Sequence, residues 1–366
     1  MKIGIITYHH ARKSYGACLQ ALALSKVCSR YGHTEIINFE NSFEQSDVKD
    51  NNVSIIVKAK RHGLFWARAI LYNAAKNPYK DIRKLDKIYG CVSDKLFYSA
   101  EEMNEVKYDI LITGSDQVWN PEITGGIEKA FLLDFGNPEK RISYAASMGS
   151  HHLSDFEKEI YKKCLSQFYE ISVREEFAKK ELQSLTDKDI FIAADPTMLL
   201  NVDEWKKIFP ELQGKATKGS YILTFFVTHG ITNYKEKVCS YAEKLDLPVW
   251  NVQHHNKKYP YVDRIIQAPS IPEFLSLIQN ASLIITNSFH GTAFAIYFHK
   301  RFISLVNRGN ASRVENLLKR LNLVDRIDLP LSAIEKEINY MEVDENMKKI
   351  KDESLTWLEK AIKTEK

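Results

Sequence analysis

The sequence predicts an α/β protein built from two domains with parallel sheets, and three observations support that prediction. The chain has 366 residues, which is more than one typical hydrophobic core accommodates. It opens with a strand-like run, a helical stripe and a second strand-like run, the order expected at the start of a Rossmann-like sheet. Later apolar runs end in small polar or charged residues, which is where α/β proteins place ligands.

The first domain is expected to span residues 1–209. Its first strand is expected at residues 3–6, where the run is short and apolar. Residues 15–30 then carry a helical stripe that Gly32 ends, and residues 35–39 form the next strand.

A helical excursion over this domain is expected at residues 41–100, which are rich in Lys, Asp and Asn and show no clear strand alternation. Its best helix candidate is the segment 64–75. Beyond the excursion, strands are expected to resume in four apolar runs, those around Ile110, Ile142, Ile171 and Ile190.

The second Rossmann-like domain is expected at residues 220–330, after a linker at 210–220 that contains two glycines and little apolar content. Helical patterns alternate there with strand-like runs at 221–227, 249–252, 283–285 and 302–305. The tail, residues 331–366, is charged and helical. Its expected buried face consists of Trp357, Leu358, Ala361 and Ile362.

Composition argues against several classes of protein. The net charge is only +4 and no basic stripe with interleaved aromatic residues is present, so a nucleic-acid partner is not expected. The five cysteines are scattered without a C-x-x-C pair, and no H-x-x-x-H or carboxylate triad occurs, so we expect free thiols and no metal site. No signal peptide and no membrane-spanning apolar run are found, which predicts a cytoplasmic location.

The most informative stretch is TNSFHGTA at residues 286–293. It follows the apolar run 282–285 and precedes a helical pattern at 293–298. The first turn of a helix offers unpaired N–H groups to an anion, and His290 can change charge near neutral pH. The stretch therefore predicts an anion site that contains a proton donor, with a structural histidine in the core or at a helix cap as the alternative.

Other motifs are also placed at strand ends. They are TYHHARKSYGACLQ at 7–20, GSDQVWNP at 114–121, YAASMG at 144–149, ISVREE at 171–176 and DPTMLL at 195–200. In this order, and together with the histidine motif, they resemble the polysaccharide pyruvyl transferase family, over about residues 3–326. The resemblance implies a GT-B-like arrangement of the two domains with a cleft between them, and a C-terminal helix that crosses back to the first domain.

The resemblance also implies a reaction. Pyruvate is transferred from phosphoenolpyruvate (PEP) to a sugar of a cell-surface polysaccharide precursor, with a pyruvate ketal and phosphate as products. PEP is a co-substrate in this reaction, and no further cofactor is expected. The expected acceptor is a lipid-linked oligosaccharide, which the enzyme would reach by peripheral contact at the inner face of the membrane.

On the PEP side, His290 matches the family's catalytic histidine and is the expected general acid, which protonates the enol carbon. Arg174 matches the family's Val-Arg-Glu motif, and its planar fork suits the carboxylate and phosphate of PEP, although a salt bridge to Glu175 or Glu176 is the alternative. Some relatives carry an Arg two residues before the histidine, where this chain has Ser288. Further PEP contacts are expected from Ser288, Gly291, Thr292, Arg308 and Arg313. For the two arginines a solvated surface position is the alternative.

On the acceptor side, Asp116 is expected to orient or deprotonate the attacking hydroxyl, and Trp119 to bury the apolar face of a sugar. The alternatives are a tight turn capped by its own polar side chains, and a tryptophan packed in the core. The remaining expected acceptor contacts are His9, His10, Arg12, Tyr15, Gln117 and Asn120.

Two other functions remain open from the sequence, because a fold does not fix a function. One is a GT-B nucleotide-sugar glycosyltransferase of polysaccharide biosynthesis, and the other is a non-catalytic protein that binds sugar or assists assembly. The sequence leaves undecided the sugar, the modified hydroxyls, the lipid linkage of the acceptor and the oligomeric state. It also does not say which of His9 and His10 contacts ligand, or what replaces the Arg missing at position 288.

Overall fold

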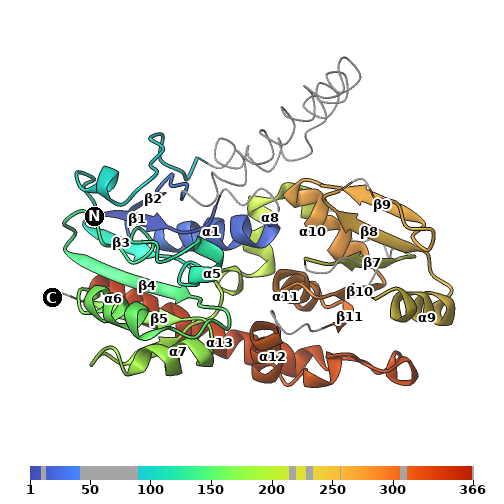
Figure 1. The fold of residues 1–366 in the computed structure, drawn as a ribbon. Helices are drawn as coiled ribbons and strands as arrows, with labels where there is room; N and C mark the ends of the chain where they lie inside the picture. The colour runs from blue at the N-terminus through green and yellow to red at the C-terminus, as the bar shows by residue number, and fades with distance from the viewer. Residues whose placement is uncertain are drawn as a thin grey trace, which may run out of the picture.

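A computed structural model describes residues 1–9, 14–41, 90–213, 220–227, 234–255, 257–305 and 311–364. The helix expected at 64–75 and the glycines of the expected linker lie outside these residues, as do three expected site residues, His10, Arg12 and Arg308. Figure 1 shows two lobes, each built around one sheet, with both chain ends at the first lobe.

The sheet of the first lobe has six parallel strands in the order β2-β1-β3-β4-β5-β6. They are β1 (Lys2–Ile6), β2 (His33–Ile36), β3 (Ile110–Thr113), β4 (Lys140–Ala146), β5 (Glu170–Val173) and β6 (Ile190–Ile192). Helices cover both faces, so the central strands are largely buried. Strand β3 is buried at every residue, and β4 is buried except at Arg141. The strand expected at 35–39 begins and ends earlier, because its pairing with β1 runs from His33 to Ile36.

The sheet of the second lobe has five parallel strands in the order β11-β10-β7-β8-β9. They are β7 (Ile222–Phe225), β8 (Val249–Gln253), β9 (Arg264–Gln267), β10 (Leu283–Thr286) and β11 (Arg301–Ser304). The sequence did not predict β9. This edge strand contains two isoleucines between an exposed Arg264 and an exposed Gln267. Its apolar run is therefore too short to be recognised as a strand in the sequence.

The helices of the described residues are α1 (Tyr15–Cys28), α5 (Pro121–Thr124), α6 (Asp155–Leu165), α7 (Glu176–Gln183), α8 (Val202–Ile208), α9 (Lys235–Leu245), α10 (Ile271–Asn280), α11 (Phe289–Tyr297), α12 (Ala311–Arg320) and α13 (Tyr340–Lys363). Side-chain caps fix several of their starts, including capping boxes at Ser154, Asn201 and Ser270. The helix expected from residue 293 begins at Phe289, so His290 lies in its first turn.

The long helix α13 runs beneath both lobes and ends against the first one (Figure 1). Ser354 accepts a hydrogen bond from the backbone N–H of Ala194 at 2.9 Å, just after β6. The Trp357 ring stacks on Phe191 of β6 with 5.4 Å between ring centroids. The last turn of α13 accepts a hydrogen bond from Lys140 of β4. A segment that follows the second sheet in sequence is therefore packed on the first.

The two lobes share a hydrophobic core and face each other with the carboxyl ends of their strands. One buried cluster includes Ile112 of β3 as well as Leu223 of β7. Strand order reverses between β1 and β3 in the first sheet, and between β7 and β10 in the second. Ligands of open α/β sheets bind outside the carboxyl ends of strands at such reversal points. A ligand site is therefore expected at the loops after β3 and β10.

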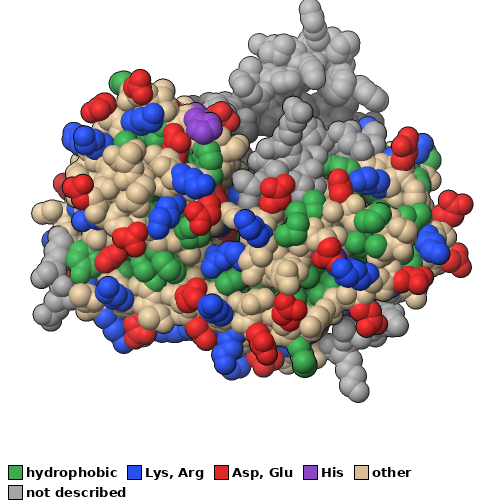
Figure 2. Space-filling model, turned by 90° about the horizontal axis from the view of Figure 1, so that it is seen from below, with side chains coloured by type: hydrophobic (Ala, Val, Ile, Leu, Met, Phe, Trp, Pro, Cys, Tyr) green, Lys and Arg blue, Asp and Glu red, His purple; other side chains and the backbone are tan. Residues whose placement is uncertain are grey.

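The surface carries charges of both signs. On the face shown in Figure 2, Lys and Arg side chains alternate with Asp and Glu over both lobes, in keeping with the net charge of +4. A mixed surface of this kind produces no extended field of one sign on that face. Within the described residues, no helix combines the length and the apolar character needed to cross a membrane.

Candidate active site

His290 lies just beyond the carboxyl end of β10, at the boundary between the lobes. Ser288 is the N-cap of α11, and its Oγ accepts the N–H of Gly291 at 3.2 Å. Thr286 Oγ1 accepts the N–H of Ser288 at 3.0 Å, which tightens the turn between strand and helix. This turn fixes His290 as the second residue of α11, with 8% of its surface exposed.

The first lobe brings an arginine and a carboxylate to the same place. Arg174 follows β5 directly, and Asp195 follows β6 and caps the short helix η4 (Pro196–Met198). Nη1 of Arg174 donates to Oδ2 of Asp195 at 2.7 Å, and Nε2 of His290 lies 3.7 Å from the same oxygen. The other oxygen of Asp195 accepts both the N–H and the hydroxyl of Thr197, at 3.0 and 2.7 Å. One fixed carboxylate thus joins an arginine of the first lobe to the histidine of the second.

Asp116 lies between two arginines that come from different lobes. It follows β3 and adopts φ of 76°, a left-handed conformation that Asp tolerates better than most residues. Its Oδ1 accepts the N–H of Gln117 at 2.9 Å and lies 3.9 Å from both Arg174 Nη2 and Arg313 Nη1. Arg313 belongs to α12. The Asp116 side chain is 17% exposed, against 0% for Asp195, so it is the more accessible carboxylate.

Burial and neighbouring charges shift the pKa values of this cluster in different directions. Burial alone would raise the pKa of Asp195, but His290 and Arg174 hold it well below its ordinary value, so the carboxylate stays ionised. Burial alone would lower the pKa of Arg174, but the carboxylates around it, led by Asp195, raise it. Burial lowers the pKa of Arg313, and the charge of Arg174 adds to that effect. Burial raises the pKa of Glu175.

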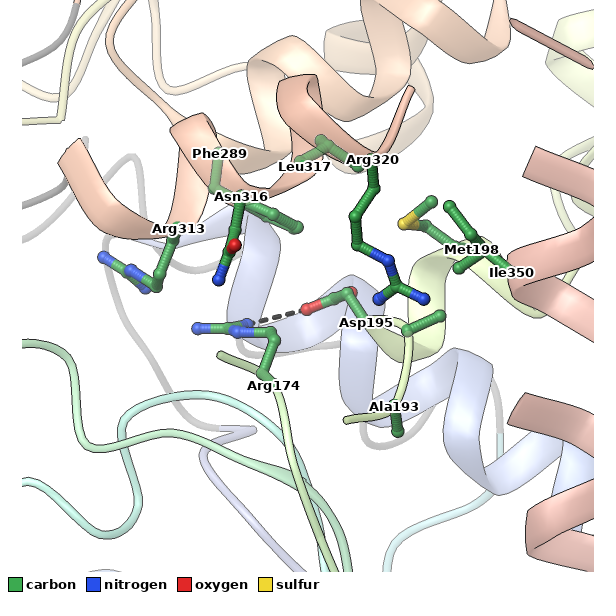
Figure 3. A pocket seen from close by; sticks show the side chains of 11 residues that line it. Arg174, Ala193, Asp195, Met198, Phe289, Arg313, Asn316, Leu317, Arg320 and Ile350 are labelled. Atoms are coloured by element: carbon green, nitrogen blue, oxygen red, sulfur yellow. Dashed lines mark hydrogen bonds and ion pairs between the residues drawn. The ribbon is translucent and has the colours of Figure 1, made fainter. Parts of the chain in front are cut away.

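A narrow cavity of about 20 Å³ opens beside these side chains. Figure 3 shows the Arg174–Asp195 pair on one side of it, with Arg313 and Arg320 of α12 reaching the same space from the other. Phe289 also lines the cavity, and its ring centroid is 5.2 Å from the guanidinium carbon of Arg174. Two unlike lobes therefore surround one small space with cations and a fixed carboxylate. The His290 imidazole does not line this space but lies 3.7 Å from that carboxylate.

The helix start at α11 offers fewer hydrogen-bond donors than the sequence suggested. The N–H of Gly291 already donates to Ser288 Oγ, and the N–H of Thr292 donates to the Ser288 carbonyl at 3.0 Å. The Thr292 side chain is 0% exposed and its hydroxyl bonds to Ser304 at 2.8 Å. The capping turn and the core use these groups in this structure, and the expectation that Gly291 and Thr292 hold phosphate stays a prediction. Ser288 lies at the site with its oxygen engaged as the cap.

The loop after β3 is held together by its own polar groups. Asn120 caps α5, its Nδ2 donates to Gln117 Oε1 at 2.8 Å, and its Oδ1 accepts the N–H of Glu122 at 3.1 Å. Gly149, at φ of 62°, lies against the same amides, since a Cβ there would be 2.4 Å from Gln117 Oε1. The capped-turn alternative describes this loop, and Asp116 is the member that faces the second lobe.

Two aromatic residues expected at the acceptor lie in the core instead. Trp119 is 1% exposed, its indole N–H donates to the Phe131 carbonyl at 2.9 Å, and the ring meets Phe168 edge-on. Tyr15 is also 1% exposed, and it stacks on Phe274 with 4.3 Å between centroids. Neither ring has a face open to a sugar in this structure, which favours packing, and the expected acceptor contacts of both residues stay predictions.

Of the two neighbouring histidines expected at the acceptor, the structure describes His9. It is 5% exposed, and its Nδ1 lies 3.0 Å from the carbonyl oxygen of Thr7. His9 thus follows β1 at the carboxyl edge of the sheet but is enclosed by protein. His10, Arg12 and Arg308 lie outside the described residues, so their expected contacts stay predictions.

Two residues of the cluster were not among the predicted site residues. The sequence places Asp195 only at a strand end, although its Asp-Pro-Thr sequence is the signal for a carboxylate that caps a short helix. Arg320 is a basic residue in the last turn of a helix, an ordinary place for one, and nothing nearby in the sequence distinguishes it. Only the packing of α12 against the first lobe shows that it lines the cavity.

Comparison with solved structures supports the fold. A Listeria monocytogenes protein assigned as a UDP-N-acetylglucosamine 2-epimerase is 11% identical, with a TM-score of 0.51, over 100% of this chain and 91% of that one. A UDP-GlcNAc 2-epimerase from Methanocaldococcus jannaschii, in complex with UDP-GlcNAc and UDP, is 13% identical, with a TM-score of 0.50, over 96% and 93%. Identities this low show the fold alone, and they confirm the expected GT-B-like arrangement of two α/β domains.

Sequence comparison gives the family. No curated protein matches the chain. The model of the polysaccharide pyruvyl transferase family matches residues 15–309, which include Arg174, Asp195 and His290. The match covers well over half of the 366 residues, and the motifs that carry the resemblance lie around the site described above. The chain belongs to the polysaccharide pyruvyl transferase family.

Proposed function

We propose that this protein transfers pyruvate from PEP to a sugar of a cell-surface polysaccharide precursor, forming a pyruvate ketal and releasing phosphate. The observation that carries the proposal is the joining of Arg174, Asp195 and His290 between the lobes. An arginine fork suits the anionic groups of PEP, and an imidazole suits proton transfer near neutral pH. Family membership supplies the reaction class, transfer to a polysaccharide.

Arg174 can serve a ligand without releasing Asp195. Its Nη1 is committed to Asp195 and Ser115, at 2.7 and 3.3 Å. Its Nε and Nη2 make no hydrogen bond within the described part of the chain, and their nearest carboxylate oxygens, on Glu175 and Asp116, are 3.8 and 3.9 Å away. Two adjacent N–H groups on one edge of a guanidinium fit the two oxygens of a carboxylate or phosphate. We assign that edge to PEP.

In the proposed reaction, His290 donates a proton to the methylene carbon of PEP. C2 thereby becomes electrophilic, and the oxygen of a sugar hydroxyl forms a bond to it. The bond between C2 and the phosphate oxygen breaks, and a second hydroxyl of the sugar then closes the ketal. Of the two hydroxyl protons, one replaces the proton that His290 gave and the other leaves with phosphate. Asp116, the most accessible carboxylate of the cluster, is the proposed acceptor of a hydroxyl proton.

The cavity in this structure is smaller than PEP. About 20 Å³ is room for a single water molecule. Binding of PEP therefore requires the lobes to separate, or Asp116 and Arg313 to turn away from the space between them. Because the site is assembled from both lobes, closure around the ligand would also complete the catalytic group and exclude water.

The proposed location of the protein is the cytoplasm, at the inner face of the membrane, and the proposed acceptor is a lipid-linked oligosaccharide. The five free cysteines support a reducing compartment. The acceptor's lipid would hold the sugar at the surface, so the protein itself needs only peripheral contact.

The direct test measures phosphate release from PEP by the purified protein, first alone and then with lipid-linked oligosaccharide. The proposal expects release that depends on both substrates, and a sugar product heavier by one pyruvate ketal in mass spectrometry. Release of a nucleoside diphosphate from a nucleotide sugar, with PEP inert, would establish the glycosyltransferase instead. Binding of oligosaccharide with no turnover of either donor would point to a non-catalytic role.

A further inference from the structure

The ring of His290 rests directly on the backbone of α1 at Gly16. A Cβ placed on Gly16 would lie 1.9 Å from His290 Nδ1, 2.3 Å from Cε1 and 2.6 Å from Cγ. All three nearest atoms belong to this one ring. Gly16 has no positive φ, so its backbone would accept alanine, and the atoms nearest to the added Cβ are those of the imidazole. The first lobe thus touches the histidine of the second at a point where no side chain fits.

The helix start that carries Gly16 is anchored on both sides. Ser14 caps α1 and accepts the N–H of Ala17 at 3.2 Å. The hydroxyl of Tyr15 donates to the Pro269 carbonyl of the second lobe at 2.7 Å, and its ring is stacked on Phe274. Gly16 itself is buried. The first turn of α1 is therefore fixed against the lobe that carries His290 and has little freedom to move away from the ring.

The opposite side of the ring is also constrained, because Nε2 of His290 faces Asp195 at 3.7 Å and that carboxylate is fixed by Thr197 and Arg174. A side chain at position 16 would force the ring to retreat by about 1.5 Å, from 1.9 Å to the 3.4 Å of ordinary contact. The ring cannot retreat this far and keep its place between Gly16 and Asp195.

We propose that Gly16 is a positioning residue for the reaction, and that its missing side chain sets where the His290 imidazole stands relative to the bound donor. Gly16 acts through His290 and touches no substrate. The inference rests on the proposed function in one respect, the role of His290 as general acid. The contact itself can be tested without any assay of transfer.

The kinetic test compares Gly16→Ala with the unchanged protein. A displacement of about 1 Å in a reacting group lowers turnover by about 10²-fold, so we expect a fall of that order in kcat with KM for PEP unchanged. Ala21→Gly is the control, since Ala21 is buried in the same helix, five residues beyond Gly16, and does not line the cavity. It should lower the melting temperature and leave kcat of the folded protein unaltered. An unchanged kcat in Gly16→Ala would overturn the proposal.

The stability test is a double-mutant cycle with His290→Ala, which removes the ring that a new Cβ would strike. In the parent protein, Gly16→Ala should lower the melting temperature. In the His290→Ala background, the same substitution should raise the melting temperature or leave it unaltered. Equal effects in both backgrounds would show that the ring does not occupy the glycine's space, and the proposal would fall. If the parent shows no pyruvyl transfer, the proposed function fails while this cycle still decides whether Gly16 holds the ring. The double variant also serves if Gly16→Ala alone does not fold.

Discussion

Replacing Asp195 by asparagine tests the centre of the site. Oδ2 of Asp195 is the closest counter-charge of Arg174, and both side chains are buried, with 0% and 4% exposed. The asparagine amide is nearly the same size and can keep its hydrogen bonds with Thr197 through its oxygen. Its NH₂ group would then face the Arg174 guanidinium, so two donors would oppose each other and the arginine would lose its nearest negative charge.

Removing one partner of a buried ion pair costs about 3–5 kcal/mol of stability, because the other charge stays buried without compensation. Arg174 keeps two more distant carboxylates, on Glu175 at 3.8 Å and Asp116 at 3.9 Å, so we expect the lower end of that range, about 3 kcal/mol. The measurement is urea unfolding of Asp195→Asn at pH 7.

Arg174→Met is the matched partner in a double-mutant cycle, since it removes the charge that Asp195→Asn would leave unpaired. The double variant should be more stable than the sum of the two single losses predicts. Additive losses, or a loss below about 1 kcal/mol for Asp195→Asn alone, would refute the ion-pair reasoning.

The dependence of this loss on pH follows from the lowered pKa of Asp195. A carboxylate with a depressed folded-state pKa contributes stability that is present above its unfolded pKa, about 3.9, and is lost as pH falls through the folded value. The difference in stability between the parent and Asp195→Asn should therefore be present near neutral pH and shrink in acid, as pH falls below the unfolded pKa.

Three further predictions concern single residues. His290→Gln should keep the fold and PEP binding but lower turnover by about 10²–10⁴-fold, and near-normal turnover would remove His290 from the mechanism. Arg174→Lys should weaken PEP binding in calorimetry, because one ammonium cannot reproduce the bidentate fork. Unchanged dissociation constants in both Arg174→Lys and Arg174→Ala would show that Arg174 serves only in a structural ion pair. Trp119→Ala should lose about 3–5 kcal/mol of stability, measured by thermal melting, with unaltered acceptor kinetics in the remaining folded protein. Retained stability with a raised acceptor KM would instead restore Trp119 to the acceptor site.

The strand ends were predictable from the sequence, and the partners of their side chains were not. Strands that are buried on both faces are mainly apolar, so an apolar run marks the strand and the polar residues after it mark its end. This pattern places Arg174 and His290 at the carboxyl ends of strands, where ligands bind. The ion pair that unites them needs Asp195, which comes from a third strand end and meets His290 only when the lobes pack. No local pattern encodes such a meeting.

The roles of the aromatic residues are ambiguous in the sequence for a related reason. A tryptophan in a polar loop can cover a sugar or fill the core beneath the turn, and the same neighbours in sequence allow both. Trp119 is buried in the core, where its indole N–H donates to the Phe131 carbonyl and its ring meets Phe168 edge-on. Tyr15 is buried because its ring stacks on Phe274 of the other lobe. In both cases the residues that bury the ring are not its neighbours in sequence, so the local sequence does not predict the burial.

The distribution of charge around the cavity suggests how an anion could enter. Asp195 is fixed by Thr197 on one oxygen and by Arg174 on the other, so a ligand gains little by competing for it. Asp116 instead stands 3.9 Å from each of two arginines, beyond hydrogen-bonding distance, and is partly exposed. Its carboxylate occupies the position between Arg174 and Arg313 where a PEP oxygen would make shorter bonds to both. If PEP binds there, it frees Asp116 at the moment the donor is in place, which is when the proposed mechanism needs a base near the acceptor hydroxyl.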